Sequence, residues 1–204
     1  MLCVLHISLY TLFLILIGPV SGGTILDGTK EGEDIDVQES RTYIAAHWHG
    51  FEDLESDVIK VTWCAGLSSG ACDVVEKTPL KPESTFVRKV LTQPISNGQK
   101  YYITVSATNS AGVTTSLSSD GVIVDDTPPM SGTVIDGIVS DVDYLNGEGD
   151  ISARWSGFED LESGVESYEL ALCDTRNLSS CPQPFTGVGK ATNVTITGKN
   201  IIRR

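Results

Sequence analysis

Apolar and polar residues alternate with a period of two along several short stretches of the chain. In residues 43–50, Ile44, Ala46 and Trp48 fall on one face. Successive side chains of a β-strand point to opposite faces, so this alternation predicts a strand with one buried face. Other stretches alternate in the same way, with predicted inward positions Ile59, Val61, Trp63, Tyr101, Ile103, Val105, Ala107, Ile151, Ala153, Trp155, Tyr168, Leu170 and Leu172. The residues predicted to face outward are Lys60, Thr62, Thr104, Ser106 and Glu169.

The chain shows no sustained helical period. Its alternating stretches recur at intervals of about 8 to 12 residues and are separated by Gly, Pro, Asn and Ser, which is typical of antiparallel β-sandwiches. The prediction is therefore an all-β protein in which two sheets pack face to face.

One seven-residue string, GFEDLES, occurs at 50–56 and again at 157–163, each time two residues after a tryptophan. Trp48 corresponds to Trp155 at an offset of 107 residues, and Cys64 to Cys173 at an offset of 109. An offset of this size is one domain length, whereas a solenoid repeat runs to roughly 20 to 50 residues. The chain is thus predicted to be a tandem of one module.

The repeated string is predicted to be the connection that leaves the tryptophan strand. Gly50 and Gly157 would permit a backbone bend that other residues avoid, Phe51 and Leu54 would cap the end of the core, and the acidic side chains would stay in water.

Residues 1–22 carry no Asp, Glu, Lys or Arg and include an apolar run over 7–17. That run is shorter than the roughly 20 residues of a membrane-spanning helix, and small residues follow it, which indicates a signal peptide cleaved near Gly22. An uncleaved anchor is the alternative. The prediction is a secreted, extracellular chain with no membrane span after cleavage.

After export, four cysteines remain, in two pairs of identical spacing. Three connectivities are possible, and the repeated spacing favours Cys64 with Cys72 and Cys173 with Cys181. In an oxidising compartment, structural disulfides are the expected role, rather than metal or redox chemistry.

The stretch ISNGQKYYITVSATNSAG, together with the core tryptophans Trp48 and Trp155, resembles the fibronectin type III family. The resemblance implies tandem immunoglobulin-like β-sandwiches and a corner role for Tyr101, which would hydrogen-bond backward along the chain. True immunoglobulin domains join their sheets through cysteines far apart in sequence, which these short pairs do not match.

The proline pair Pro128 and Pro129 marks a stiff link between modules. The predicted modules are therefore 23–129 and 130–204. The second has no counterpart of the last two strands of the first, so it is predicted to be incomplete, and either further sequence or a strand from a partner would complete it.

The formal net charge of −13 argues against nucleic acid as a partner, because phosphate binding requires clustered Lys and Arg. Acidic loops can bind calcium weakly, and the candidate ligands are Glu52, Asp53, Asp125 and Asp126. Their repeats Glu159, Asp160 and Glu162, along with Glu55, Asp141 and Asp143, supply further carboxylates. Solvated loops are the more ordinary explanation for all of them.

No catalytic or cofactor site is predicted. His47 and His49 could chelate a metal from one strand face, but the second module has Arg154 and Ser156 at these places. Asn177 and Asn193 begin glycosylation sequons. We expect a non-enzymatic spacer or protein-interaction region of a secreted, matrix, receptor or adhesion protein. The alternatives are an accessory region of a secreted enzyme and a calcium-dependent adhesion module.

Overall fold

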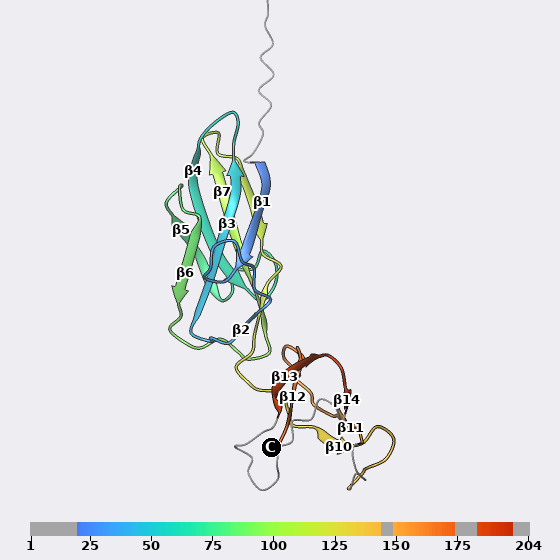
Figure 1. Cartoon of the computed structure of the whole chain (residues 1–204). Coiled ribbons are helices and arrows are strands. Elements are labelled where there is room, and N and C mark those ends of the chain that lie inside the picture. The colour runs from blue at the N-terminus through green and yellow to red at the C-terminus, as the bar shows by residue number, and fades with distance from the viewer. Residues whose placement is uncertain (1–19, 144–148, 174–182, 198–204) are drawn as a thin grey trace, which may run out of the picture. The chain divides into compact units, whose positions relative to one another are not determined.

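The computed structural model describes residues 20–143, 149–173 and 183–197, which form fourteen strands and no helix (Figure 1). It divides into two units, Met1–Val124 and Asp125–Arg204. The division falls before the predicted boundary at Pro129, because Val124 still bonds the backbone of the first unit at Gly98 and Gln99. The Asp125 carboxylate instead accepts a hydrogen bond from Ser163 of the second unit.

The strands of the first unit are β1 (Val20–Asp27), β2 (Val37–Gln38), β3 (Tyr43–Glu52), β4 (Val58–Gly66), β5 (Val75–Leu80), β6 (Phe86–Val90), β7 (Lys100–Asn109), β8 (Thr114–Ser118) and β9 (Val122–Val124). Those of the second unit are β10 (Thr133–Asp136), β11 (Ile151–Ser156), β12 (Tyr168–Leu172), β13 (Gln183–Gly189) and β14 (Asn193–Ile196).

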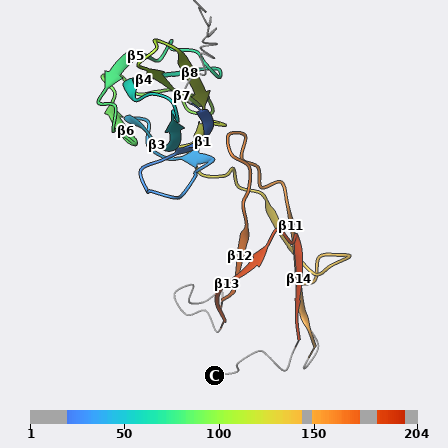
Figure 2. The ribbon, with the colours of Figure 1, turned by 90° about the horizontal axis from the view of Figure 1, so that it is seen from above.

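Two sheets build the first unit. One has the order β1-β3-β6, and the other has the order β2-β9-β7-β4-β5, with β8 also paired to β7. All pairs are antiparallel except β2 with β9. Figure 2 shows the sheet of β1, β3 and β6 as one layer and the sheet of β4, β5, β7 and β8 as the other. This is an immunoglobulin-like β-sandwich in which β5 joins β4 rather than β6.

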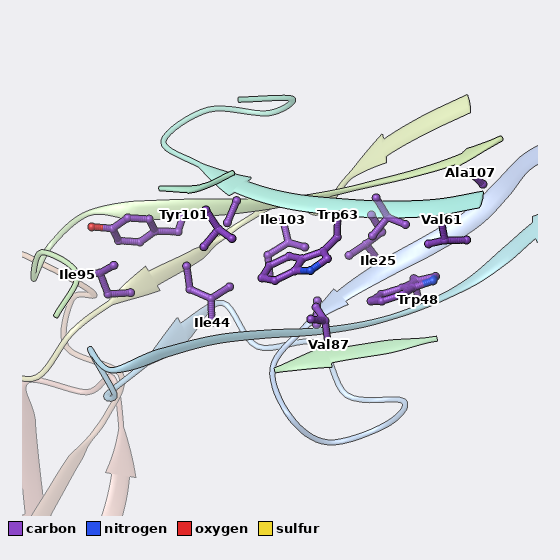
Figure 3. Close-up of a cluster of buried hydrophobic side chains, with 14 of the residues drawn as sticks. Ile25, Ile44, Trp48, Val61, Trp63, Val87, Ile95, Tyr101, Ile103 and Ala107 are labelled. Carbon is purple, nitrogen blue, oxygen red and sulfur yellow. The ribbon is translucent and has the colours of Figure 1, made fainter. Parts of the chain in front are cut away.

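The core of the first unit lies between these layers (Figure 3). Trp63 and Ile103 point inward from one sheet, while Ile44 and Trp48 point inward from the other. Tyr101 is also buried, and its phenolic oxygen accepts the N–H of Ser96 at 2.8 Å. This is the backward hydrogen bond that the resemblance implies for a corner tyrosine.

Strand β4 departs from the predicted alternation at its start. Ile59 is 55 % exposed, although the pattern predicts it to face inward. The register of β4 against β7 shifts between Val58 and Lys60, so Ile59 is the extra residue of a bulge and turns outward. Val58 packs against the core in its place.

The outward face of this sheet is also more covered than predicted. Thr62, Thr104 and Ser106 are buried, and hydroxyl pairs with the neighbouring strand β8 cover the last two. Thr104 bonds Ser118 and Ser106 bonds Ser116, each at 2.8 Å between oxygens.

In the second unit, β10-β11-β14 form one sheet and β12-β13 another. They correspond in order to β1, β3 and β6 and to β4 and β5 of the first unit. Trp155 is 6 % exposed and meets Tyr168 edge to face. Within the part of this unit that the structure describes, no strand corresponds to β7, β8 or β9, and β12 pairs with β13 alone.

Most of the predicted signal peptide, residues 1–19, lies outside the described residues. Residues 20–22 belong to β1, which pairs Val20 with Glu52 and Ser21 with Phe51. Strand pairing therefore begins before the predicted cleavage position. Among the residues described, none belongs to a helix of the length and apolar character needed to cross a membrane.

Candidate functional site

The GFEDLES string builds the same loop twice, and an aspartate in each copy is the reason. The Asp53 carboxylate accepts the N–H groups of Glu55 and Ser56 at 2.8 and 2.9 Å. In the second copy, Asp160 accepts those of Glu162, Ser163 and Gly164. A side chain that bonds the backbone two and three residues ahead folds the loop locally.

The glycines of the string behave as predicted, since Gly50 has φ 83° and Gly157 has φ 74°. Leu54 does not cap the core as predicted, because it is 91 % exposed, and its repeat Leu161 is 79 % exposed. The strand β3 continues through Glu52, so the turn begins only at Asp53 and carries Leu54 away from the core. Phe51, within the strand, does pack against the core.

Asn109 ties this loop to the end of β7. It is 2 % exposed, and its Nδ2 donates to Asp53 Oδ2 at 2.7 Å. Its Oδ1 accepts the N–H groups of Ala111 and Val113 at 3.1 and 2.9 Å. The hydrogen bond from Asn109 is the main reason why the pKa of Asp53 lies below its ordinary value.

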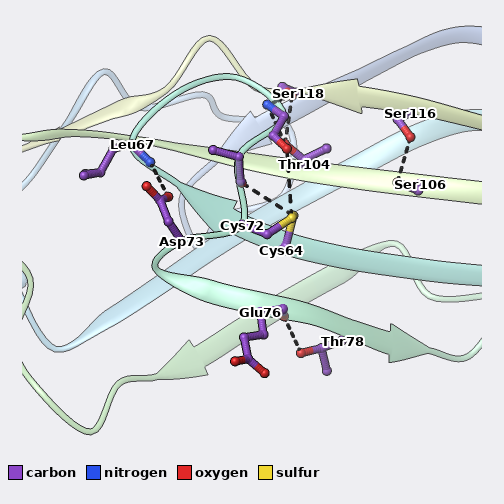
Figure 4. The surroundings of a disulfide bond; sticks show 12 residues. Cys64, Leu67, Cys72, Asp73, Glu76, Thr78, Thr104, Ser106, Ser116 and Ser118 are labelled. Atoms are coloured by element: carbon purple, nitrogen blue, oxygen red, sulfur yellow. Dashed lines mark hydrogen bonds between the residues drawn. A yellow bond between two sulfur atoms is a disulfide. The ribbon is translucent and has the colours of Figure 1, made fainter.

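A disulfide joins Cys64 on β4 to Cys72, with the two Cα atoms 5.2 Å apart (Figure 4). The loop that it closes has other attachments. The Gly70 N–H donates to the hydroxyls of Thr104 and Ser118, and the Leu67 N–H donates to the Asp73 carboxylate. Cys173 is also disulfide-bonded, and its predicted partner Cys181 lies outside the described residues.

Replacing both Cys64 and Cys72 with alanine is expected to lower the free energy of unfolding by about 2 to 3 kcal/mol. The effect is modest because the bridge closes only a small loop, and so removes little conformational entropy from the unfolded chain. The β-sheet circular dichroism should persist, because backbone and hydroxyl contacts still hold the loop. Urea unfolding and far-ultraviolet spectra check both points. Loss of the β signature in buffer would contradict an auxiliary role for this bridge.

The calcium candidates from the sequence are mostly engaged in hydrogen bonds. Asp53 Oδ1 accepts hydrogen bonds from its own loop and Oδ2 accepts one from Asn109, whereas Glu52 and Asp126 are exposed. Asp125 Oδ1 accepts the N–H and hydroxyl of Thr127, and its Oδ2 accepts the Ser163 hydroxyl, which is the main cause of its lowered pKa. Asp125 does lie with Asp160 and Glu162 in a carboxylate cluster, but its oxygens are satisfied by the protein.

A second carboxylate cluster lies in the first unit and consists of Asp27, Asp34 and Asp120. No sequence pattern brought these three together, because the third lies far along the chain from the first two. The pair Asp27 and Asp34 does recur as Asp136 and Asp141, which is the signal that could have drawn attention to them.

Within this cluster, Asp27 is fully buried while Asp34 and Asp120 are exposed. Burial is the largest cause that raises the pKa of Asp27, from 3.8 to about 7. Repulsion by Asp34 and Asp120 raises this pKa further, whereas hydrogen bonds from Ser119 and Gly121 lower it.

The histidine pair does not form a metal cluster with other side chains in the described part of the chain. The His47 ring stacks on Phe86 and its Nε2 lies 3.2 Å from the Thr29 carbonyl oxygen, whereas His49 is exposed. Of the two sequon asparagines, Asn193 is exposed at the start of β14, and Asn177 lies outside the described residues.

Fold and site together define an all-β protein of immunoglobulin-like sandwiches, with a local disulfide in the first unit. A search of protein-family models found no match, and a search of curated proteins found none either. Among solved structures, the chain is similar to the crystal structure of the FN1–FN3 domains of chicken CNTN1, with a TM-score of 0.32 and 13 % identity. The similarity covers 79 % of this chain and 53 % of that one, so this chain spans about half its length. It assigns neither function nor partner.

Proposed function

We propose that this chain is a non-enzymatic region of an extracellular protein, in which fibronectin type III-like modules act as a spacer and as a protein-interaction surface. The local disulfide supports an oxidising location, because such bridges persist mainly outside the cytosol. The exposed sequon at Asn193 is compatible with a secreted glycoprotein.

The observation that carries the interaction role is the unequal pairing of equivalent strands. In the first unit, β4 bonds β5 on one edge and β7 on the other. In the second unit, β12 bonds β13 alone among the described strands. An edge that no described strand occupies offers backbone N–H and C=O groups to an added strand, which is a common mode of peptide recognition.

The partner that this edge fits is a β-strand with the alternation of β7. On β7, Tyr101, Ile103 and Val105 supply the inward apolar face of the first unit. The second unit has a matching apolar hollow lined by β10, β11, β12 and β14, including Val134, Ala153 and Leu170. A strand on β12 would place its apolar side chains over this hollow, whether it belongs to a partner or to the same polypeptide.

A peptide with the sequence of residues 100–109 tests this role on the isotope-labelled full chain. Its addition should protect the amides of β12 from hydrogen exchange, and a control peptide with serine at the positions of Ile103 and Val105 should not. Equal protection by both peptides, or by neither, would contradict strand addition at this edge.

Location is tested separately by expression of the full chain in a secretory eukaryotic cell. The protein should reach the medium with Cys64 and Cys72 oxidised, and Asn193→Gln should remove one glycan from its mass. Retention in the cytosol with free thiols would contradict an extracellular role.

A further inference from the structure

Three segments distant in sequence meet at the Asp27 cluster. Asp27 ends β1, Asp34 lies in the loop before β2, and Asp120 lies in the break between β8 and β9. The Asp27 N–H donates to Asp34 Oδ1 at 2.7 Å, and the Gly121 N–H donates to Asp27 Oδ2 at 3.1 Å. One carboxylate oxygen from each of the three aspartates lies within 4.8 Å of the other two.

The buried member of the cluster has an oxygen that the protein does not satisfy. Asp27 is 0 % exposed, and its Oδ1 has no hydrogen-bond partner among the described residues. No lysine or arginine of the described chain pairs with any of the three carboxylates. Gly121 and Ser119 hydrogen-bond the Asp27 carboxylate, but its Oδ1 stays unsatisfied. Burying an ionised carboxylate with an unsatisfied oxygen is costly unless the group is protonated or binds a cation.

We infer that Asp27, Asp34 and Asp120 form a binding site for a calcium ion. Oxygens that ligate one calcium ion lie about 2.3 to 2.6 Å from it, so two of them can be up to roughly 5 Å apart. The spread of this cluster fits that limit. Asp34 and Asp120 face solvent, so water can supply the remaining ligands, as is usual in calcium sites.

Calcium fits this site better than the softer metals, because every side-chain ligand is a carboxylate oxygen. The site is separate from the Asp125 cluster, whose oxygens accept hydrogen bonds from the protein. It is also independent of the proposed strand addition, because all three aspartates belong to the first unit.

The second unit supplies a matched control. Asp136 and Asp141 occupy the places of Asp27 and Asp34, since Gly137 follows with a positive φ as Gly28 does. The Val142 N–H donates to the Asp136 carbonyl as the Ile35 N–H donates to that of Asp27. Asp136 is nevertheless exposed, and no third carboxylate joins it among the described residues.

The test is thermal unfolding of the full chain at pH 8, in EDTA and in 10 mM CaCl2. If the dissociation constant is on the order of 10⁻⁴ to 10⁻³ M, calcium should raise the Tm of the first unit by roughly 5 to 10 °C. Asp27→Asn and Asp120→Asn should abolish this rise, and Asp136→Asn should retain it. Heteronuclear NMR should show calcium-dependent shifts at the Gly121 amide, which borders the site.

Two further conditions make the result decisive. NaCl at matched ionic strength should not raise the Tm comparably. An equal rise in Tm would overturn the inference, because salt would then be stabilising the acidic chain by screening its charges. Because Asp27→Asn can disturb the buried end of β1, the exposed variant Asp120→Asn serves as the folded comparison. No calcium-dependent rise in the wild type, or an undiminished rise in Asp120→Asn, would also overturn the inference.

Discussion

Replacing Asp27 with asparagine is expected to remove a penalty of up to about 4 kcal/mol that the wild-type first unit acquires as the pH rises from below 4 to above 7. The native pKa of Asp27 is about 7, mainly because of burial, against 3.8 for the free group. Between these values the native state holds more protons than the unfolded state, so the stability of the wild type falls as the pH rises. Below pH 3.8 both states are protonated and this penalty vanishes.

Asparagine cannot ionise, so Asp27→Asn should lack this part of the pH dependence. Urea unfolding in EDTA from pH 4 to 8.5 measures it, with calcium removed so that ion binding does not add to stability. Asp136→Asn, at the exposed equivalent place, should follow the wild type throughout. Parallel pH profiles for Asp27→Asn and the wild type would show that Asp27 ionises in the native state as it does in water.

Asn109→Ala is expected to lower the free energy of unfolding by about 3 kcal/mol, because a buried amide that makes at least three hydrogen bonds is lost. The variant should also return the pKa of Asp53 toward 3.8, since the hydrogen bond from Asn109 is the largest cause that lowers it. Denaturant unfolding and carboxylate NMR titration measure these two effects.

The neighbouring variant Ser110→Ala serves as the control. The Ser110 hydroxyl is exposed and donates only to the Asp57 carbonyl, so its loss should change stability by less than about 0.5 kcal/mol. A double-mutant cycle with Asp53→Ala should show coupling between Asp53 and Asn109. Additive effects would mean that this loop is held by its own turn rather than by β7.

The lowered native pKa of Asp53 makes its contribution to stability sensitive to acid. A lowered native pKa stabilises the folded chain above the unfolded value, and this stabilisation is lost as the pH falls through the native pKa. Asp27 has the opposite sign, because its native pKa is raised. Acid therefore increases the contribution of Asp27 to stability and decreases that of Asp53. Burial sets the direction for Asp27, and hydrogen bonding sets it for Asp53.

Local pattern was sufficient for most of the first unit. The alternation at Ile44, Ala46 and Trp48 predicts a strand with one buried face, and these residues are buried on β3. The repeated glycines predict a bend, and both adopt positive φ. These features depend on the period of side chains along a strand and on the absence of a Cβ, which are properties of the chain itself.

Pattern failed where pairing between distant segments decides the outcome. Ile59 faces outward because the register of β4 against β7 shifts there, and the bulge has no mark in the alternation. Leu54 was expected in the core, but β3 extends to Glu52 and carries the turn outward. Register shifts and strand ends depend on how two strands pair, so they cannot be predicted from the residues of one strand alone.

The amino-acid sequence by itself determined the all-β class, the tandem of two modules and the strand faces around the tryptophans, because these follow from local periodicity and repetition. Only the tertiary structure decided that Asp53 is anchored by Asn109 and that Asp27, Asp34 and Asp120 share one site. Closure of the sandwich brings Asp53 to Asn109 across 56 positions of the chain and Asp27 to Gly121, the neighbour of Asp120, across 94 positions. It also removes water from Asp27. The chemistry of a carboxylate depends on what surrounds it, and those surroundings come from other strands.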